Sequence, residues 1–129
     1  MAEERVRTIV QLVEPQGLFT QALIDVFMEA GLEVDHTGPE LDVRRTIDNP
    51  PDIIFFDADY LTQPLEAIRL ARVLARNATI IMYTSAAQTA VDEAFGEAGA
   101  DIVLQKSAER RTIVQRLRTV ERERRHGIT

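Results

Sequence analysis

Short apolar segments alternate along the chain with longer segments in which apolar residues recur every three or four positions. The short runs are typical of strands buried on both faces of a sheet, and the longer periodicity is typical of helices that cover one. The pattern therefore predicts a series of strand–helix units. The strands are expected at 8–13, 32–37, 53–56, 78–83 and 102–104, and the helices at 16–30, 40–48, 64–76, 86–98 and 107–125.

The expected helix ends carry residues with known terminal preferences. Gly31 and Gly99 follow the first and fourth helices, where glycine commonly ends a helix. Pro64 suits the first turn of the third helix, and Ser107 is expected to cap the amino end of the last one. The last helix should bury Ile113, Val114, Leu117 and Val120, and the first should bury Leu18, Phe19, Ala22, Leu23, Val26, Phe27 and Ala30.

The alternation of strands and helices with short connections predicts a parallel sheet with helices on both faces. Right-handed crossovers favour an α/β fold, a (βα)5 doubly wound, flavodoxin-like parallel sheet with strand order 2-1-3-4-5. The 129 residues and 45% hydrophobic content suit a single domain over 1–129, with a core over about 6–125. In this topology ligands bind at the carboxyl ends of the strands, between the first strand and the third.

A carboxylate ends the most apolar strand, because the run at 53–56 leads directly to Asp57. Burying such a charge is costly unless a partner pairs with it. Glu14, Thr84 and Lys106 follow the first, fourth and fifth strands, so the topology brings all four side chains to one edge. The set suits attack of Asp57 on phosphorus, with Lys106 balancing the charge, Thr84 bonding a phosphoryl oxygen, and a divalent metal on the carboxylates.

In these features the chain resembles the receiver domain of two-component response regulators, the CheY-like family. The resemblance spans nearly the whole chain. It rests on Leu-Val-Glu at 12–14, Pro-Asp-Ile-Ile-Phe-Phe-Asp at 51–57, Met-Tyr-Thr-Ser-Ala at 82–86, and Ala-Gly-Ala-Asp at 98–101 leading to Lys106. The 22-residue separation of Thr84 and Lys106 is also the family's usual spacing.

The resemblance implies a role for each residue at this edge. Asp57 would be the phosphoacceptor, Thr84 the switch hydroxyl and Lys106 the phosphate-contacting lysine. Glu14 falls at an acidic position of the family's Mg²⁺ site, so the implied metal ligands are Glu14 and Asp57, with Asp59 either a substitute ligand or a solvated turn residue. The phosphoryl donor would be a sensor histidine kinase or a phosphotransfer protein.

The chain also departs from the family pattern. Pro15 replaces the second of two adjacent acids, so we expect a weak or altered Mg²⁺ site, since Mg²⁺ depends on few protein carboxylates. Val103 stands where the family usually has a rotating aromatic ring. Ser107 replaces the proline after the lysine, and because a non-proline cis bond is costly, we expect a trans bond or a differently shaped loop there.

Charge is distributed unevenly along the chain. The net charge is −6, but eight Lys or Arg and only three Glu follow from Lys106 onward, so residues 1–105 carry −11. This contrast disfavours general nucleic-acid binding by the body and leaves an anionic partner open for the last helix. We expect a downstream protein to dock on the face of the fourth helix, fifth strand and last helix, through Arg118, Arg122 and Arg125.

Several classes of function are disfavoured. The chain has no cysteine, no Gly-rich phosphate loop and no apolar run of membrane-spanning length, and its charged amino end lacks a signal-peptide pattern. We therefore expect a cytoplasmic, non-enzymatic signalling receiver without a DNA-binding domain in this chain. The alternative is a pseudo-receiver, a protein-interaction module that works without phosphate. A further alternative is cyclic di-GMP binding, because some CheY-like proteins bind it through an Arg-rich last helix.

Overall fold

The computed structural model describes residues 7–126 as five parallel strands in one sheet, in the order β2-β1-β3-β4-β5. This order confirms the fold expected from the sequence. It places β1 and β3 side by side at the centre, where the direction of the crossovers changes. The strands are β1 (Ile9–Val13), β2 (Glu33–Gly38), β3 (Ile53–Asp57), β4 (Thr79–Thr84) and β5 (Ile102–Gln105).

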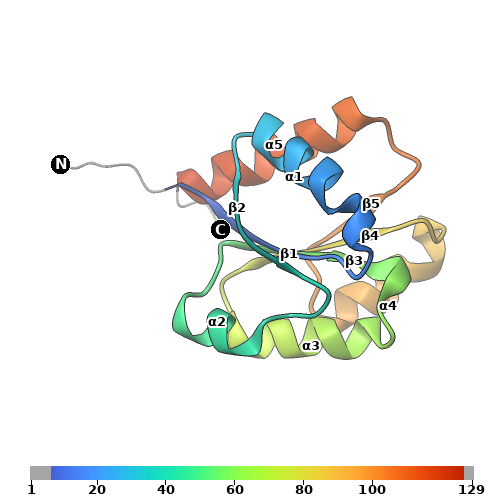
Figure 1. Ribbon diagram of the computed structural model, residues 1–129. Helices are drawn as coiled ribbons and strands as arrows, with labels where there is room; N and C mark the ends of the chain where they lie inside the picture. Colours follow the sequence, from blue (N-terminus) through green and yellow to red (C-terminus); the bar gives the residue numbers. More distant parts are fainter. Residues whose placement is uncertain (1–6, 127–129) are drawn as a thin grey trace.

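Helices cover both faces of the sheet: α1 and α5 lie on one face, and α2, α3 and α4 on the other (Figure 1). Two 3-10 turns, η1 (Gly17–Phe19) and η2 (Ala58–Tyr60), follow β1 and β3. None of the described helices is long and apolar enough to cross a membrane. The helices are α1 (Thr20–Glu29), α2 (Val43–Asp48), α3 (Pro64–Leu74), α4 (Gln88–Ala98) and α5 (Arg110–Arg125).

Strand β3 divides the hydrophobic core into two layers. Ile53 and Phe55 pack with the residues of α1 and α5, whereas Ile54 and Phe56 pack with those of α3 and α4, as the two-residue period of a strand requires. The ring of Phe55 meets that of Phe27 edge-on, with 4.9 Å between the ring centres. Because β3 is buried on both faces, the backbone at its carboxyl end is held in place by packing, and so is the position of Asp57.

The first helix begins later than the sequence predicted. Leu18 and Phe19 lie in η1 and are 86% and 45% exposed, and Ala22 is exposed as well, so their assignment to the buried stripe was wrong. The Glu14 carboxylate accepts a hydrogen bond from the Gln16 N–H at 2.8 Å, and this local bond shapes the loop after β1. The buried apolar face of α1 therefore begins only at Leu23.

Two other helix starts also differ from expectation. The amino cap of α5 is Glu109 rather than Ser107, because residues 106–108 form a turn closed by the bond from the Ala108 N–H to the Gln105 carbonyl. Helix α2 begins only at Val43, after Asp42, whose side chain accepts the Arg45 N–H as an amino cap does. The expected burial of Ile113, Val114, Leu117 and Val120 is confirmed.

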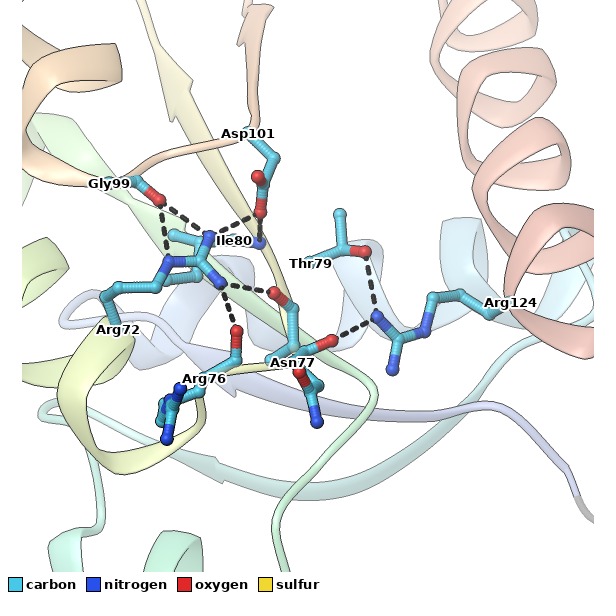
Figure 2. A network of polar contacts seen from close by, with 9 residues as sticks. Arg72, Arg76, Asn77, Thr79, Ile80, Gly99, Asp101 and Arg124 are labelled. Carbon is cyan, nitrogen blue, oxygen red and sulfur yellow. Dashed lines mark hydrogen bonds and ion pairs between the residues drawn. The ribbon is translucent and has the colours of Figure 1, made fainter. Parts of the chain in front are cut away.

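Arg72 of α3 ties together the amino-terminal edge of the sheet, opposite the predicted site (Figure 2). Its guanidinium donates to the carbonyls of Gly99, Arg76 and Ala78 and forms a 2.6 Å ion pair with Asp101. Gly99 has φ +123°, and a Cβ there would come within 3.3 Å of the Arg72 side chain. The glycine is therefore needed both for its conformation and for the close approach of Arg72.

Arg124 of α5 makes a second connection at the same edge. It donates to the Asn77 carbonyl and to the Thr79 hydroxyl (Figure 2). Its guanidinium also lies 3.5 Å from the Asp52 carboxylate. Asp52 also accepts the Ile9 N–H at 2.8 Å. These bonds connect strands and helices from both layers of the fold. The polar contacts of Arg72 and Arg124 therefore stabilise the amino-terminal edge of the sheet, and the predicted site lies at the opposite edge.

Candidate functional site

Asp57 and Lys106 form an ion pair at the carboxyl ends of β3 and β5. Asp57 is 2% exposed, and its Oδ1 lies 2.8 Å from the Lys106 Nζ. The Lys106 N–H continues the strand pairing by donating to the Thr84 carbonyl at 2.9 Å, which fixes the lysine beside the end of β4. The juxtaposition of these side chains is the one that the sequence predicted, and it supplies the buried carboxylate with its cation.

Asp59 links the other polar groups of the site. Its carboxylate accepts the Thr84 hydroxyl at 2.7 Å and the Ser85 N–H at 3.1 Å, and it lies 3.1 Å from the Lys106 Nζ. The turn η2 directs it there, because the Asp57 carboxylate caps that turn and accepts the Asp59 N–H. Burial alone would raise the pKa of Asp59, but the bonds from Thr84 and Ser85, together with Lys106, lower it to about 2.

Glu14 is a buried carboxyl group beside Asp57. It is 3% exposed, and among the described residues its Oε1 has no hydrogen-bond partner, while its other oxygen accepts the Gln16 N–H. Burial and the neighbouring Asp57 carboxylate raise the pKa of Glu14 to about 7, against the opposing effects of Gln16 and Lys106. The protonated Oε1 would supply a donor for Asp57.

We predict that Glu14→Gln stabilises the fold above pH 7. Between pH 4.5 and about 7 the folded chain holds a proton on Glu14 that the unfolded chain releases, so stability falls as pH rises through this window. At pH 8 the ionised Glu14 lowers the free energy of unfolding by something on the order of 1–2 kcal/mol after solvent screening, a cost that an amide does not have. Urea unfolding at pH 5 and pH 8 measures the difference.

The matched control is Glu66→Gln, which removes a carboxylate from an exposed position in the first turn of α3. This control should show the same difference from wild type at both pH values. A Glu14→Gln variant that differs from wild type equally at pH 5 and pH 8 would contradict the assignment of the titrating group.

The carboxylates do not form the expected metal set. The described residues include no group of three or more His, Cys, Asp or Glu side chains placed to hold a metal ion. Asp59 is engaged by Thr84, Ser85 and Lys106, and its role as a substitute metal ligand stays a prediction. The Asp57 oxygen that faces Lys106 is also paired. These residues do not fit a well-formed Mg²⁺ site, since that ion requires near-octahedral oxygen ligation.

We predict that Mg²⁺ binds with millimolar or weaker affinity and that Pro15→Asp tightens binding by about tenfold or more, because it restores a second carboxylate after β1. Isothermal titration calorimetry at neutral pH provides the measurement. Pro15→Ala is the control, because it removes the ring without adding a ligand and should leave the affinity unchanged. Submillimolar affinity in the wild-type chain would contradict the prediction.

Two tyrosines and a backbone amide belong to the site but were missed in the sequence. The Lys106 Nζ lies 5.1 Å from the centre of the Tyr60 ring and 5.4 Å from that of Tyr83. The Ser85 N–H is the donor to Asp59 described above. Tyr60 follows Asp57 by three residues and Tyr83 precedes Thr84, so proximity in sequence was the available signal. Together they border a hollow of about 420 Å³, lined by Glu14, Phe19, Ala22, Leu23, Asp57, Asp59, Tyr60, Tyr83, Ser85 and Lys106.

The two remaining departures from the family pattern have different structural outcomes. No cis peptide bond occurs within residues 7–126, so the bond between Lys106 and Ser107 is trans, as expected. Val103 is partly buried and borders a hollow of about 320 Å³ between β5, α4 and α5, together with Asp92, Gly96 and Arg116. The hollow therefore lies beside the position at which the family usually has an aromatic ring.

The three arginines of the expected partner face lie elsewhere. Arg118, Arg122 and Arg125 line a hollow of about 510 Å³ with Glu29 and Gly31, between α1 and α5. Arg118 donates to the Glu29 carbonyl at 3.1 Å, whereas the helical period turns Arg116 toward the face of α4 and β5. Placing the three arginines on the face of α4, β5 and α5 was wrong.

Comparisons with known proteins identify the fold. No protein-family model and no curated protein sequence matches the chain. Solved structures do match. The REC domain of AraT, a response regulator from Geobacillus stearothermophilus, has a TM-score of 0.78 and 13% identity, and the match covers 96% of this chain and 100% of that one.

Two further structures are similar. A LuxR-family two-component response regulator from Aurantimonas sp. SI85-9A1 has a TM-score of 0.80 and 23% identity, covering 93% of this chain and 89% of that chain. A putative pilus assembly-related protein from Burkholderia pseudomallei has a TM-score of 0.76 and 20% identity, covering 94% and 96%. The chain therefore has the fold of response-regulator receiver domains, and at these identities the likeness concerns the fold.

Proposed function

We propose that this chain is a signalling receiver module and that Asp57 accepts a phosphoryl group. The observation that carries the proposal is the pairing of a buried strand-end carboxylate with Lys106 at 2.8 Å, on a receiver fold. Thr84 lies at the end of the adjacent strand, where its hydroxyl can bond a phosphoryl oxygen. In this role phosphorylation of Asp57 would control the binding of the chain to another protein, and the chain would catalyse no reaction beyond its own phosphorylation.

The chemistry needs few groups. An Asp57 carboxylate oxygen forms a bond to phosphorus as the bond to the donor breaks, and the electron pair leaves with the donor group. The donor would be the phosphohistidine of a sensor histidine kinase or of a phosphotransfer protein, whose imidazole is the leaving group. Lys106 balances the charge that accumulates on the phosphoryl oxygens, and the product is an aspartyl phosphate.

Acetyl phosphate tests the proposal without a partner protein, because it can donate a phosphoryl group directly to Asp57 and releases acetate. We expect intact-mass spectrometry to show one added phosphoryl group on wild type and none on Asp57→Asn. The control Asp25→Asn removes an exposed carboxylate from α1 and should label as wild type does. Labelling that persists in Asp57→Asn would show that another residue is the acceptor.

A phosphate-independent interaction module is the second candidate. Its support is that Asp59 already takes the donors of Thr84, Ser85 and Lys106, and that the three-carboxylate metal set is not formed. In either case we propose that the hollow lined by Arg118, Arg122 and Arg125 docks an acidic partner protein, since charge complementarity favours such an encounter. Absence of labelling in wild type and in all the variants would favour this candidate.

A further inference from the structure

We infer that the Asp59 carboxylate is an internal oxyanion that fills the phosphoryl position of the site. Asp59 then competes with any phosphoryl group on Asp57 and holds the loop after β4 in the anion-bound arrangement. The inference rests on the proposed function for the identity of the competing group. It concerns regulation of that same site.

The geometry consists of three donors directed at one carboxylate. The Thr84 hydroxyl donates to Oδ1 at 2.7 Å, the Ser85 N–H lies 3.1 Å from both oxygens, and the Lys106 Nζ lies 3.1 Å from Oδ2. A hydroxyl, a backbone amide and an ammonium form the kind of cradle that binds a tetrahedral oxyanion. Here the cradle is occupied by a side chain of the same chain.

The arrangement of the loop depends on this occupant. Thr84 uses its hydroxyl hydrogen for Asp59 while its oxygen accepts the Ala86 N–H at 3.0 Å, so one chain of bonds runs from Asp59 to the start of the loop before α4. Lys106 is shared between Asp59 and Asp57, which connects the cradle to the predicted acceptor. The cradle cannot give the same donors to a second anion while Asp59 holds them.

Two consequences follow from this competition. Asp59 is tethered two residues from Asp57, so it binds the cradle at a high effective concentration, which a free anion must overcome. Its negative charge also opposes the approach of a phosphoryl donor. We therefore expect small-molecule phosphoryl donors to phosphorylate Asp57 of the wild-type chain slowly. We also expect the loop after β4 to be ordered already in the absence of phosphate.

The first test uses NMR on ¹⁵N-labelled protein without any phosphoryl donor. In Asp59→Ala the Ser85 amide proton should move upfield, because it loses a charge-assisted bond, and titration with inorganic phosphate should return it toward the wild-type position. The wild-type resonance should not respond to phosphate. Glu66→Ala is the control for loss of an exposed carboxylate and should behave as wild type does.

The second test measures labelling rates with acetyl phosphate. We expect Asp59→Ala to label at Asp57 about tenfold or more faster than wild type, because one opposing charge and one competitor are removed. Asp59→Asn keeps the size of the side chain, guards against a folding defect, and should also label faster. Glu66→Ala should label at the wild-type rate.

The outcomes separate the inference from the proposed function. An unchanged Ser85 amide in Asp59→Ala, a wild-type amide that responds to phosphate as the variant does, or slower labelling in both Asp59 variants would overturn the inference. No labelling in any chain, with the NMR results as expected, would refute the phosphoacceptor role of Asp57. The internal anion would then remain as a permanent part of a phosphate-independent module.

Discussion

Replacing Lys106 with Met is expected to lower the free energy of unfolding by about 3 kcal/mol at neutral pH, because removing one partner of a buried ion pair leaves the other uncompensated. Asp57 is 2% exposed and would keep the Asp59 N–H as a donor, and Glu14 where that group is protonated, but no cation. Asp59 would lose the same cation, and Glu14 lies beside Asp57. Equilibrium urea unfolding at pH 7 measures the loss.

Two variants control this experiment. Adding Asp57→Asn to Lys106→Met should recover a large part of the loss, because the stranded charge is removed with its partner. Arg45→Met breaks an exposed pair with Asp35 on the surface and should cost only about 0–1 kcal/mol. If the single and double Lys106 variants are equally unstable, the ion pair is not the cause of the loss.

Replacing Arg72 with Ala is expected to cost about 2–4 kcal/mol in the free energy of unfolding, because it leaves several backbone carbonyls without a donor and Asp101 without its cation, with only the Ile80 N–H still bonded to that carboxylate. The guanidinium serves Gly99, Arg76, Ala78 and Asp101 at once, and it joins two loops at the amino-terminal edge of the sheet. Arg72→Lys should recover only part of the loss, since a single ammonium cannot reproduce the fork of the guanidinium. Thermal and urea unfolding provide the measurement.

The control is Arg69→Ala, which removes an exposed arginine from the middle of the same helix. A substitution of this kind on the surface should change the free energy of unfolding by no more than about 0.5 kcal/mol. Equal effects of the two alanine substitutions would show that the loss of an arginine from α3, rather than the loss of this network, explains the result for Arg72, since alanine favours the helix at least as well as arginine does.

The sheet could be predicted from the sequence because its signal is local and strong. The run at 53–56 is apolar throughout, and strand–helix alternation with short connections leaves few topologies. The helix starts could not be predicted as well, because they depend on side-chain bonds in the preceding loops. Leu18 and Phe19 fit the apolar period of α1, but the bond between Glu14 and the Gln16 N–H shapes a loop in which they are exposed.

The site was predictable as far as topology alone determines it. Strand ends of a parallel sheet meet at one edge, so the positions of Asp57 and Lys106 followed from the strand order. The orientation of Asp59 did not follow, because it depends on a 3-10 turn and on a backbone amide at Ser85, neither of which has a sequence signature. The prediction that Arg118, Arg122 and Arg125 face α4 and β5 was wrong, because a row of charged residues along a helix does not show which neighbouring element it faces.

Within residues 7–126, the absence of a three-carboxylate metal set and the position of Asp59 have a common electrostatic basis. A carboxylate turned toward Lys106 and the Thr84 hydroxyl is stabilised by both, whereas one turned toward Glu14 and Asp57 would meet further carboxylates. Without a strongly bound cation, the first arrangement has the lower energy. The site therefore relies on Lys106, the one lysine of the chain, for compensation of its negative charge.

Chemical trapping of the phosphoryl group tests most directly whether Asp57 is the residue that carries it. Borohydride reduces an aspartyl phosphate to homoserine and leaves free aspartate unchanged. Wild-type protein and Asp59→Ala would be treated with acetyl phosphate, reduced and mapped by peptide mass spectrometry. We expect homoserine at position 57 in both chains, at higher yield in the variant. Homoserine at position 59 of wild type, or at no position in either chain, would contradict the account.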